Sequence, residues 1–93
     1  MPATPQKSIS ILIVDDSELV RTGLKTLLDA HAPTAGALLR IVGEAGTAEE
    51  ALGRIPATSP NVAVLDVRLP DGDGVEVCRE IRSRNPEIAC IML

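Results

Sequence analysis

Four short, largely apolar runs recur along the chain, and this recurrence limits the possible folds more than any other feature. The runs are residues 9–14, 38–42, 61–65 and 88–93. A nearly continuous apolar run of this length is typical of a strand whose two faces are both buried. We therefore predict four buried β-strands.

Each segment between these runs carries the signals of a helix. Apolar residues recur three or four positions apart, as on one helix face: Val20, Leu24, Leu27 and Leu28; then Ala48, Ala51, Leu52 and Ile55; then Val77, Cys78 and Ile81. Thr47 and Glu50 form a capping-box pattern, Pro56 is expected to end the second helix, and residues 69–74 are expected to form a turn. Because strands and helices alternate, the predicted fold is α/β, a doubly wound parallel sheet with helices on both faces.

Composition restricts the class of protein. The 93 residues suffice for one domain, with residues 1–8 as a flexible tail and residues 9–93 as the folded part. With a net charge of −4 and no aromatic residue, the chain itself is not expected to bind nucleic acid. No apolar run approaches the ~20 residues of a membrane span, and no signal-peptide pattern is present. Cys78 and Cys90 lie in apolar patterns, so we expect reduced thiols and a cytoplasmic location.

Acidic residues follow two of the predicted strands. Asp15 and Asp16 end the first run, and Asp66 ends the third. If the strand order is 2-1-3-4, these carboxylates meet at the edge where parallel sheets bind ligands. Carboxylates so close repel one another, and Mg²⁺, which prefers oxygen ligands, would relieve the repulsion and let Asp66 attack phosphorus. The alternative is that Asp16 or Ser17 only caps a helix and Asp66 is an ordinary turn residue.

The residues around these aspartates resemble a known family. Residues 11–17, Ile-Leu-Ile-Val-Asp-Asp-Ser, are similar to the opening strand of bacterial two-component receiver domains, which have the CheY-like, flavodoxin-like fold. Residues 62–74, Val-Ala-Val-Leu-Asp-Val-Arg-Leu-Pro-Asp-Gly-Asp-Gly, are similar to their phosphoacceptor strand and following loop. Residues 42–46 and 48–51 match the second strand and helix of these domains. Taken together, the three segments are most similar to the NarL/FixJ type, whose members usually join the receiver to a helix-turn-helix DNA-binding domain.

The resemblance implies a role for each matching residue. Asp66 matches the phosphoacceptor, and Asp15 and Asp16 match the acidic pair that holds Mg²⁺. Arg68 matches the position whose backbone carbonyl completes the metal site, and Pro70 and Gly74 match the loop that shapes the site. The implied phosphodonor is a sensor histidine kinase or a small phosphodonor. The chain would thus be a signalling module and not an enzyme, because Asp66 takes part only in its own phosphorylation.

The sequence departs from the family pattern at its end. Receiver domains follow the fourth strand with a Ser or Thr and then a fifth strand ending in Lys, whereas this sequence stops at Leu93. Neither Lys7 nor Lys25 matches that lysine. We therefore expect a partial receiver domain without the fifth strand, a fragment of a transcriptional regulator whose DNA contacts belong to an output domain absent here. The fourth strand would be an exposed apolar edge through which chains could form homo-oligomers.

Other functions fit the sequence less well. A non-phosphorylated receiver remnant, acting in dimerisation or docking, is favoured by the missing Ser/Thr and Lys. A phosphatase of the haloacid-dehalogenase kind needs a second Asp two residues after the nucleophile, where this chain has Arg68. A calcium loop at residues 71–74 fails at Val75 and Arg82, which occupy ligand positions. His31 lies in a Pro/Gly segment without partner ligands, so we expect a surface residue.

Overall fold

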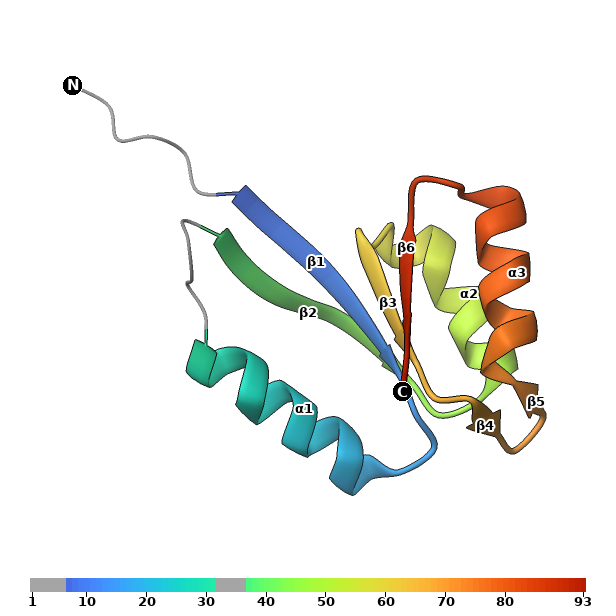
Figure 1. Ribbon diagram of the computed structural model, residues 1–93, viewed down its shortest axis with the longest axis horizontal. Coiled ribbons are helices and arrows are strands. Elements are labelled where there is room, and N and C mark those ends of the chain that lie inside the picture. The colour runs from blue at the N-terminus through green and yellow to red at the C-terminus, as the bar shows by residue number, and fades with distance from the viewer. Residues whose placement is uncertain (1–6, 32–36) are drawn as a thin grey trace.

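Four parallel strands form the centre of the computed structural model, which describes residues 7–31 and 37–93 (Figure 1). The elements in chain order are β1 (Lys7–Val14), α1 (Glu18–His31), β2 (Ala37–Ala45), α2 (Ala48–Thr58), β3 (Val62–Leu65), β4 (Arg68–Leu69), β5 (Gly72–Asp73), α3 (Gly74–Arg84) and β6 (Ala89–Met92). The order in the sheet is β2-β1-β3-β6, and every neighbouring pair is parallel. This confirms the predicted α/β class and the predicted order of the four strands.

The helices cover the two faces of the sheet unequally. Helices α2 and α3 pack side by side on one face, and α1 lies on the other (Figure 1). The core lies mainly under α2 and α3, where Leu12, Leu65 and Ile81 are at most 1% exposed. Helix α1 contributes no fully buried residue among those described, and Leu27 on its predicted apolar face is 58% exposed. The apolar spacing of α1 therefore predicted the helix correctly but overstates its burial.

One local prediction was wrong, and another was incomplete. Helix α2 does not end at Pro56 but continues to Thr58, because the proline removes only its own N–H, and the helical bond from Ser59 N to Ile55 O remains, at 2.8 Å. The expected turn at residues 69–74 contains a small antiparallel hairpin, in which Leu69 pairs with Gly72.

Several expectations concern the ends of elements and the chain termini. The expected tail, residues 1–8, lies outside the described residues except for Lys7 and Ser8, which begin β1. The side chain of His31 also lies outside the described part.

Cys78 on α3 and Cys90 on β6 are free, half-buried thiols that pack against the core. Among the described residues, no helix combines the length and the apolar character needed to cross a membrane.

Candidate functional site

Three aspartates from two neighbouring strands meet at one edge of the sheet. Strands β1 and β3 pair in register up to Val14 and Leu65, so the residues that follow them emerge side by side. One carboxylate oxygen from each of Asp15, Asp16 and Asp66 lies within 4.8 Å of the other two. The structure therefore brings together the carboxylates whose convergence the strand order predicts.

Main-chain hydrogen bonds fix the positions from which these side chains project. The sheet ladder continues through both acidic positions, because Asp15 N donates to Ala45 O at 2.9 Å and Asp66 N donates to Val14 O at 2.8 Å. Asp15 is only 6% exposed, and its Oδ1 accepts a hydrogen bond from Ser17 N at 2.8 Å. These bonds hold the two strand ends rigidly next to each other.

The acidic cluster lacks an ion-pair partner in the part of the chain that the structure describes. Among the described side chains, no Lys or Arg forms an ion pair with Asp15, Asp16 or Asp66. Adjacent carboxylates repel one another. A set of three oxygen donors, one buried, one half-buried and one exposed to water, fits a hard divalent cation that keeps part of its water shell.

Gly74 lets the loop after β3 close tightly over the site. Its N–H donates to Val67 O at 2.7 Å, which ties the start of α3 to the residue after Asp66. A Cβ at position 74 would lie 2.1 Å from the carbonyl oxygen of Asp66 and 3.0 Å from Cε of Met92. Only a glycine therefore permits this approach between α3 and the Asp66 peptide.

A hairpin beside the site supplies caps for two helices. The Asp71 carboxylate accepts hydrogen bonds from Ala48 N at 2.7 Å and Glu49 N at 3.1 Å, at the start of α2. These bonds hold the pKa of Asp71 below its ordinary value. Asp73 Oδ1 similarly accepts from Val75 N and Glu76 N and caps α3. The aspartates of the apparent calcium loop thus serve as helix caps.

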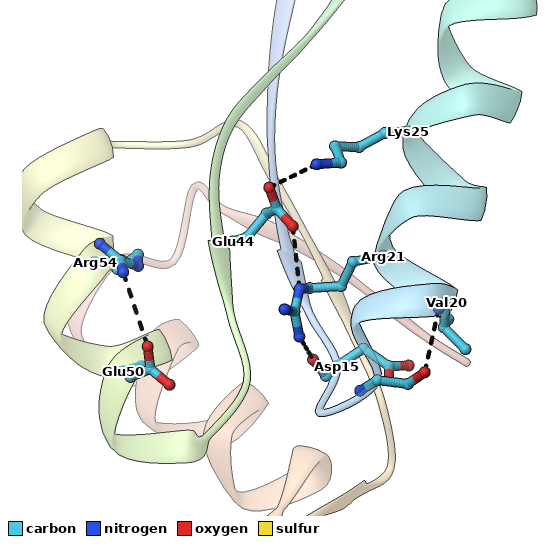
Figure 2. A network of polar contacts seen from close by, with 8 residues as sticks. Asp15, Val20, Arg21, Lys25, Glu44, Glu50 and Arg54 are labelled. Carbon is cyan, nitrogen blue, oxygen red and sulfur yellow. Dashed lines mark hydrogen bonds and ion pairs between the residues drawn. The ribbon is translucent and has the colours of Figure 1, made fainter.

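A polar network between α1 and β2 was not predicted from the sequence (Figure 2). Arg21 Nε donates to Glu44 Oε1 at 3.0 Å, Lys25 Nζ donates to Glu44 Oε2 at 2.9 Å, and Arg21 Nη1 donates to Asp15 O at 2.5 Å. The hydrogen bond from Lys25 is the main cause that holds the pKa of Glu44 below its ordinary value, against the raising effect of burial. The available signal was the spacing of Arg21 and Lys25, which places both on one helix face.

Comparison with known proteins identifies the family. The family described as the response regulator receiver domain matches residues 11–93. The chain belongs to this family. The receiver domain is 51% identical over 85 residues to the DNA-binding transcriptional activator DevR/DosR of Mycobacterium tuberculosis, covering 91% of this chain and 37% of that protein. It is 31% identical over 86 residues to the response regulator protein VraR of Staphylococcus aureus, covering 92% and 39% respectively.

Solved structures share the fold of this receiver domain. The non-phosphorylated receiver domain of the stress response regulator RcsB from Escherichia coli gives a TM-score of 0.82 at 22% identity, over 94% of this chain and 65% of that one. A LuxR-family two-component response regulator from Aurantimonas gives a TM-score of 0.79 at 30% identity, over 92% and 58%. The chain spans less than two fifths of the length of the two curated relatives, which are 37% and 39% covered.

Proposed function

We propose that this receiver domain accepts a phosphoryl group on Asp66 as part of a two-component response regulator. The observation that carries the proposal is the cluster of Asp15, Asp16 and Asp66, whose ligand oxygens lie within 4.8 Å of one another. Family membership supplies the reaction class, and the uncompensated charge supplies a reason for a cation at this place. Mg²⁺ is the proposed cation, held by the three carboxylates and by the backbone carbonyl of Arg68.

In the proposed reaction, the residues of the site have separate roles. Asp66, half-buried at the end of β3, is the nucleophile: one carboxylate oxygen bonds to phosphorus while the bond from phosphorus to the donor breaks. The donor leaves with the electron pair of that bond, and an acyl phosphate remains on Asp66. Bound Mg²⁺ supplies neutralisation of the charge on the transferring group. Asp66 Oδ1 also accepts from Arg68 N at 3.2 Å, which orients the carboxylate.

The proposed donor is the phosphohistidine of a sensor kinase, with small acyl phosphates as a substitute. The relatives suggest the wider context, since DevR/DosR is a DNA-binding transcriptional activator. We propose that this receiver domain belongs to a transcriptional regulator, with DNA contacted through a separate output domain. The net charge of −4 does not favour direct DNA contact by this domain.

Labelling with acetyl phosphate tests the assignment. The wild-type protein should gain one phosphoryl mass in the presence of Mg²⁺ and none after chelation. Asp66→Asn should abolish the gain, whereas Asp29→Asn, an equivalent change on the exposed surface of α1, should leave it intact. Equal labelling of Asp66→Asn and wild type, with both variants folded by circular dichroism, would refute Asp66 as the acceptor.

A second candidate function is docking without phosphorylation. Among the described strands β6 lies at an edge of the sheet, where Ile91 is 51% exposed. An exposed apolar side chain favours contact with another chain, so we propose self-association through the face of β6 that carries Ile91. In this case association measured by analytical ultracentrifugation should fall in Ile91→Lys and should be the same in Asp66→Asn and after chelation. Dependence on Asp66 or Mg²⁺ would assign association to the phosphorylation cycle.

A further inference from the structure

Arg21 connects the carbonyl of a proposed metal ligand to a second strand of the sheet. The guanidinium uses two of its nitrogens: Nη1 donates to Asp15 O at 2.5 Å, and Nε donates to Glu44 Oε1 at 3.0 Å (Figure 2). The Arg21 side chain is only 18% exposed. Two hydrogen bonds from one largely buried guanidinium to two acceptors are stronger and more directional than a surface ion pair.

A bulge in β2 turns Glu44 toward this arginine. Val42 has no partner in the β1–β2 register, so Ile11 pairs with Ile41 but Leu12 pairs with Gly43. Side chains alternate between the two faces of a strand, and one extra residue reverses the alternation after it. Glu44 therefore lies on the face of the sheet that α1 covers, while Ala45 remains in the core.

Both oxygens of Glu44 are engaged, which fixes the carboxylate. Arg21 holds one oxygen and Lys25 Nζ holds the other at 2.9 Å. A carboxylate held at both oxygens can fix the direction of the guanidinium, so Nη1 remains aimed at the Asp15 carbonyl. Among the described residues, Asp15 O accepts a hydrogen bond from Arg21 and none from Lys25, so the two basic side chains have separate roles.

The carbonyl of Asp15 controls more than one ligand. The peptide group is planar, so a fixed C=O direction also fixes the plane that joins the Cα atoms of Asp15 and Asp16. These two Cα atoms are the origins of two of the three clustered carboxylates. Rotation of this plane would change the separation of the carboxylates without breaking the sheet ladder.

We propose that Arg21 is a positioning residue for the cation site, and that Glu44 orients it for this role. The inference rests on the proposed function, because it assumes that Asp15 and Asp16 hold the cation. Arg21 touches neither the cation nor the phosphoryl group. Its contribution is to fix the Asp15–Asp16 peptide plane so that the carboxylates are arranged before the cation binds.

The sign of the change in Mg²⁺ affinity distinguishes positioning from simple electrostatics. Removal of a positive charge near a cation site should strengthen Mg²⁺ binding if charge alone matters. Loss of a residue that orients metal ligands weakens binding by about 10- to 100-fold. Arg21→Gln should therefore raise the dissociation constant for Mg²⁺ at least about 10-fold, measured by isothermal titration calorimetry with MgCl₂ alone.

Two matched variants control the experiment. Lys25→Gln removes a positive charge from the same network but leaves Arg21 on Asp15, so any loss of Mg²⁺ affinity should be much smaller than in Arg21→Gln. Arg54→Gln repeats the arginine substitution at an exposed i,i+4 pair with Glu50 and should have no effect. Arg21→Lys keeps the charge but cannot donate in a planar fork, so it should also weaken binding. This variant decides the question if Arg21→Gln does not fold.

The outcomes separate this inference from the proposed function. Unchanged or tighter Mg²⁺ binding by folded Arg21→Gln or Arg21→Lys, with normal binding by the wild type, overturns the positioning role alone. Equal weakening in Lys25→Gln also overturns it, because that result would assign the effect to the charge network. A folded wild-type protein that takes up no Mg²⁺ overturns the proposed cation site and this inference together.

Discussion

Replacement of Gly74 by alanine should damage the site through the main chain. A Cβ at this position would lie 2.1 Å from Asp66 O and 2.9 Å from Asp66 C, and real Cβ contacts essentially never fall below 3.0 Å. The start of α3 and the Asp66 peptide would have to separate by about 0.9 Å, the difference between 3.0 and 2.1 Å. Met92 can move away because its Cε is the end of a flexible side chain, but the Asp66 backbone belongs to the sheet.

Two opposing effects set the size of the stability change. Alanine favours a helix over glycine by at most about 1 kcal/mol, and less at the first residue of a helix. Overpacking against fixed neighbours costs about 1–3 kcal/mol. Because the obstacle is backbone, we expect the overpacking to dominate and the free energy of unfolding to fall by about 1–2 kcal/mol. A displacement near 1 Å at a reacting group can slow a reaction by about 10²-fold, so acetyl phosphate labelling of Asp66 should slow strongly.

The control is Gly53→Ala, the same substitution on α2, where a Cβ would meet nothing within 4 Å. This variant should label like the wild type and unfold at the same or a higher urea concentration. Urea titration followed by circular dichroism gives the stability, and mass spectrometry gives the labelling rate. If Gly74→Ala labels and unfolds like Gly53→Ala, the close contact at Gly74 does not shape the site.

Three further predictions follow from local contacts. Burial, with the adjacent Cys78 thiol, raises the pKa of Cys90 to about 11 from an ordinary 9.0. Alkylation of Cys90 by iodoacetamide at pH 8 should therefore be about 100-fold slower in the native protein than in the urea-unfolded protein, and equal rates would contradict this. The pKa of Asp71 is lowered, so the stabilising effect of its carboxylate is present above the ordinary pKa of 3.8 and is lost as the pH falls through the lowered pKa. Asp71→Asn should therefore unfold at a lower urea concentration than wild type at pH 7, and this difference should vanish in acid. Ser59 has a φ of 44°, a left-handed conformation that glycine adopts more easily than serine. Ser59→Gly should therefore raise the free energy of unfolding, measured by thermal denaturation, by up to about 1 kcal/mol, and a decrease would contradict strain at this residue.

The sequence predicted those parts of the structure that depend on burial and chain order. Strand β1 could be predicted because its apolar run is buried on both faces, with Leu12 and Ile13 each 0% exposed. The convergence of Asp15 and Asp66 followed from their places at the ends of strands, once a 2-1-3-4 order was assumed. Both inferences rest on patterns that several neighbouring residues share, so no single residue decides them.

The features that the sequence did not predict depend on single residues with distant partners. The pairing of Glu44 with Arg21 requires the bulge at Val42, and nothing in the local pattern of β2 marks that residue as unpaired. The cap that Asp71 provides for α2 joins positions more than twenty residues apart, across a hairpin read from sequence only as a turn. The continuation of α2 past Pro56 reflects a bond that the proline does not remove.

The proposed cation site depends on the sheet as well as on the aspartates themselves. Two unit charges 4 Å apart repel by about 1 kcal/mol in bulk water and by about 4 kcal/mol near a protein surface. A flexible loop would relax by moving its backbone, but Val14 and Leu65, just before the acidic positions, are at most 1% exposed and held in register. With the backbone held in this way, the repulsion is reduced by rotation of the side chains or by the proposed cation. In the proposed function, the rigid strand ends thereby turn a common residue type into a cation site.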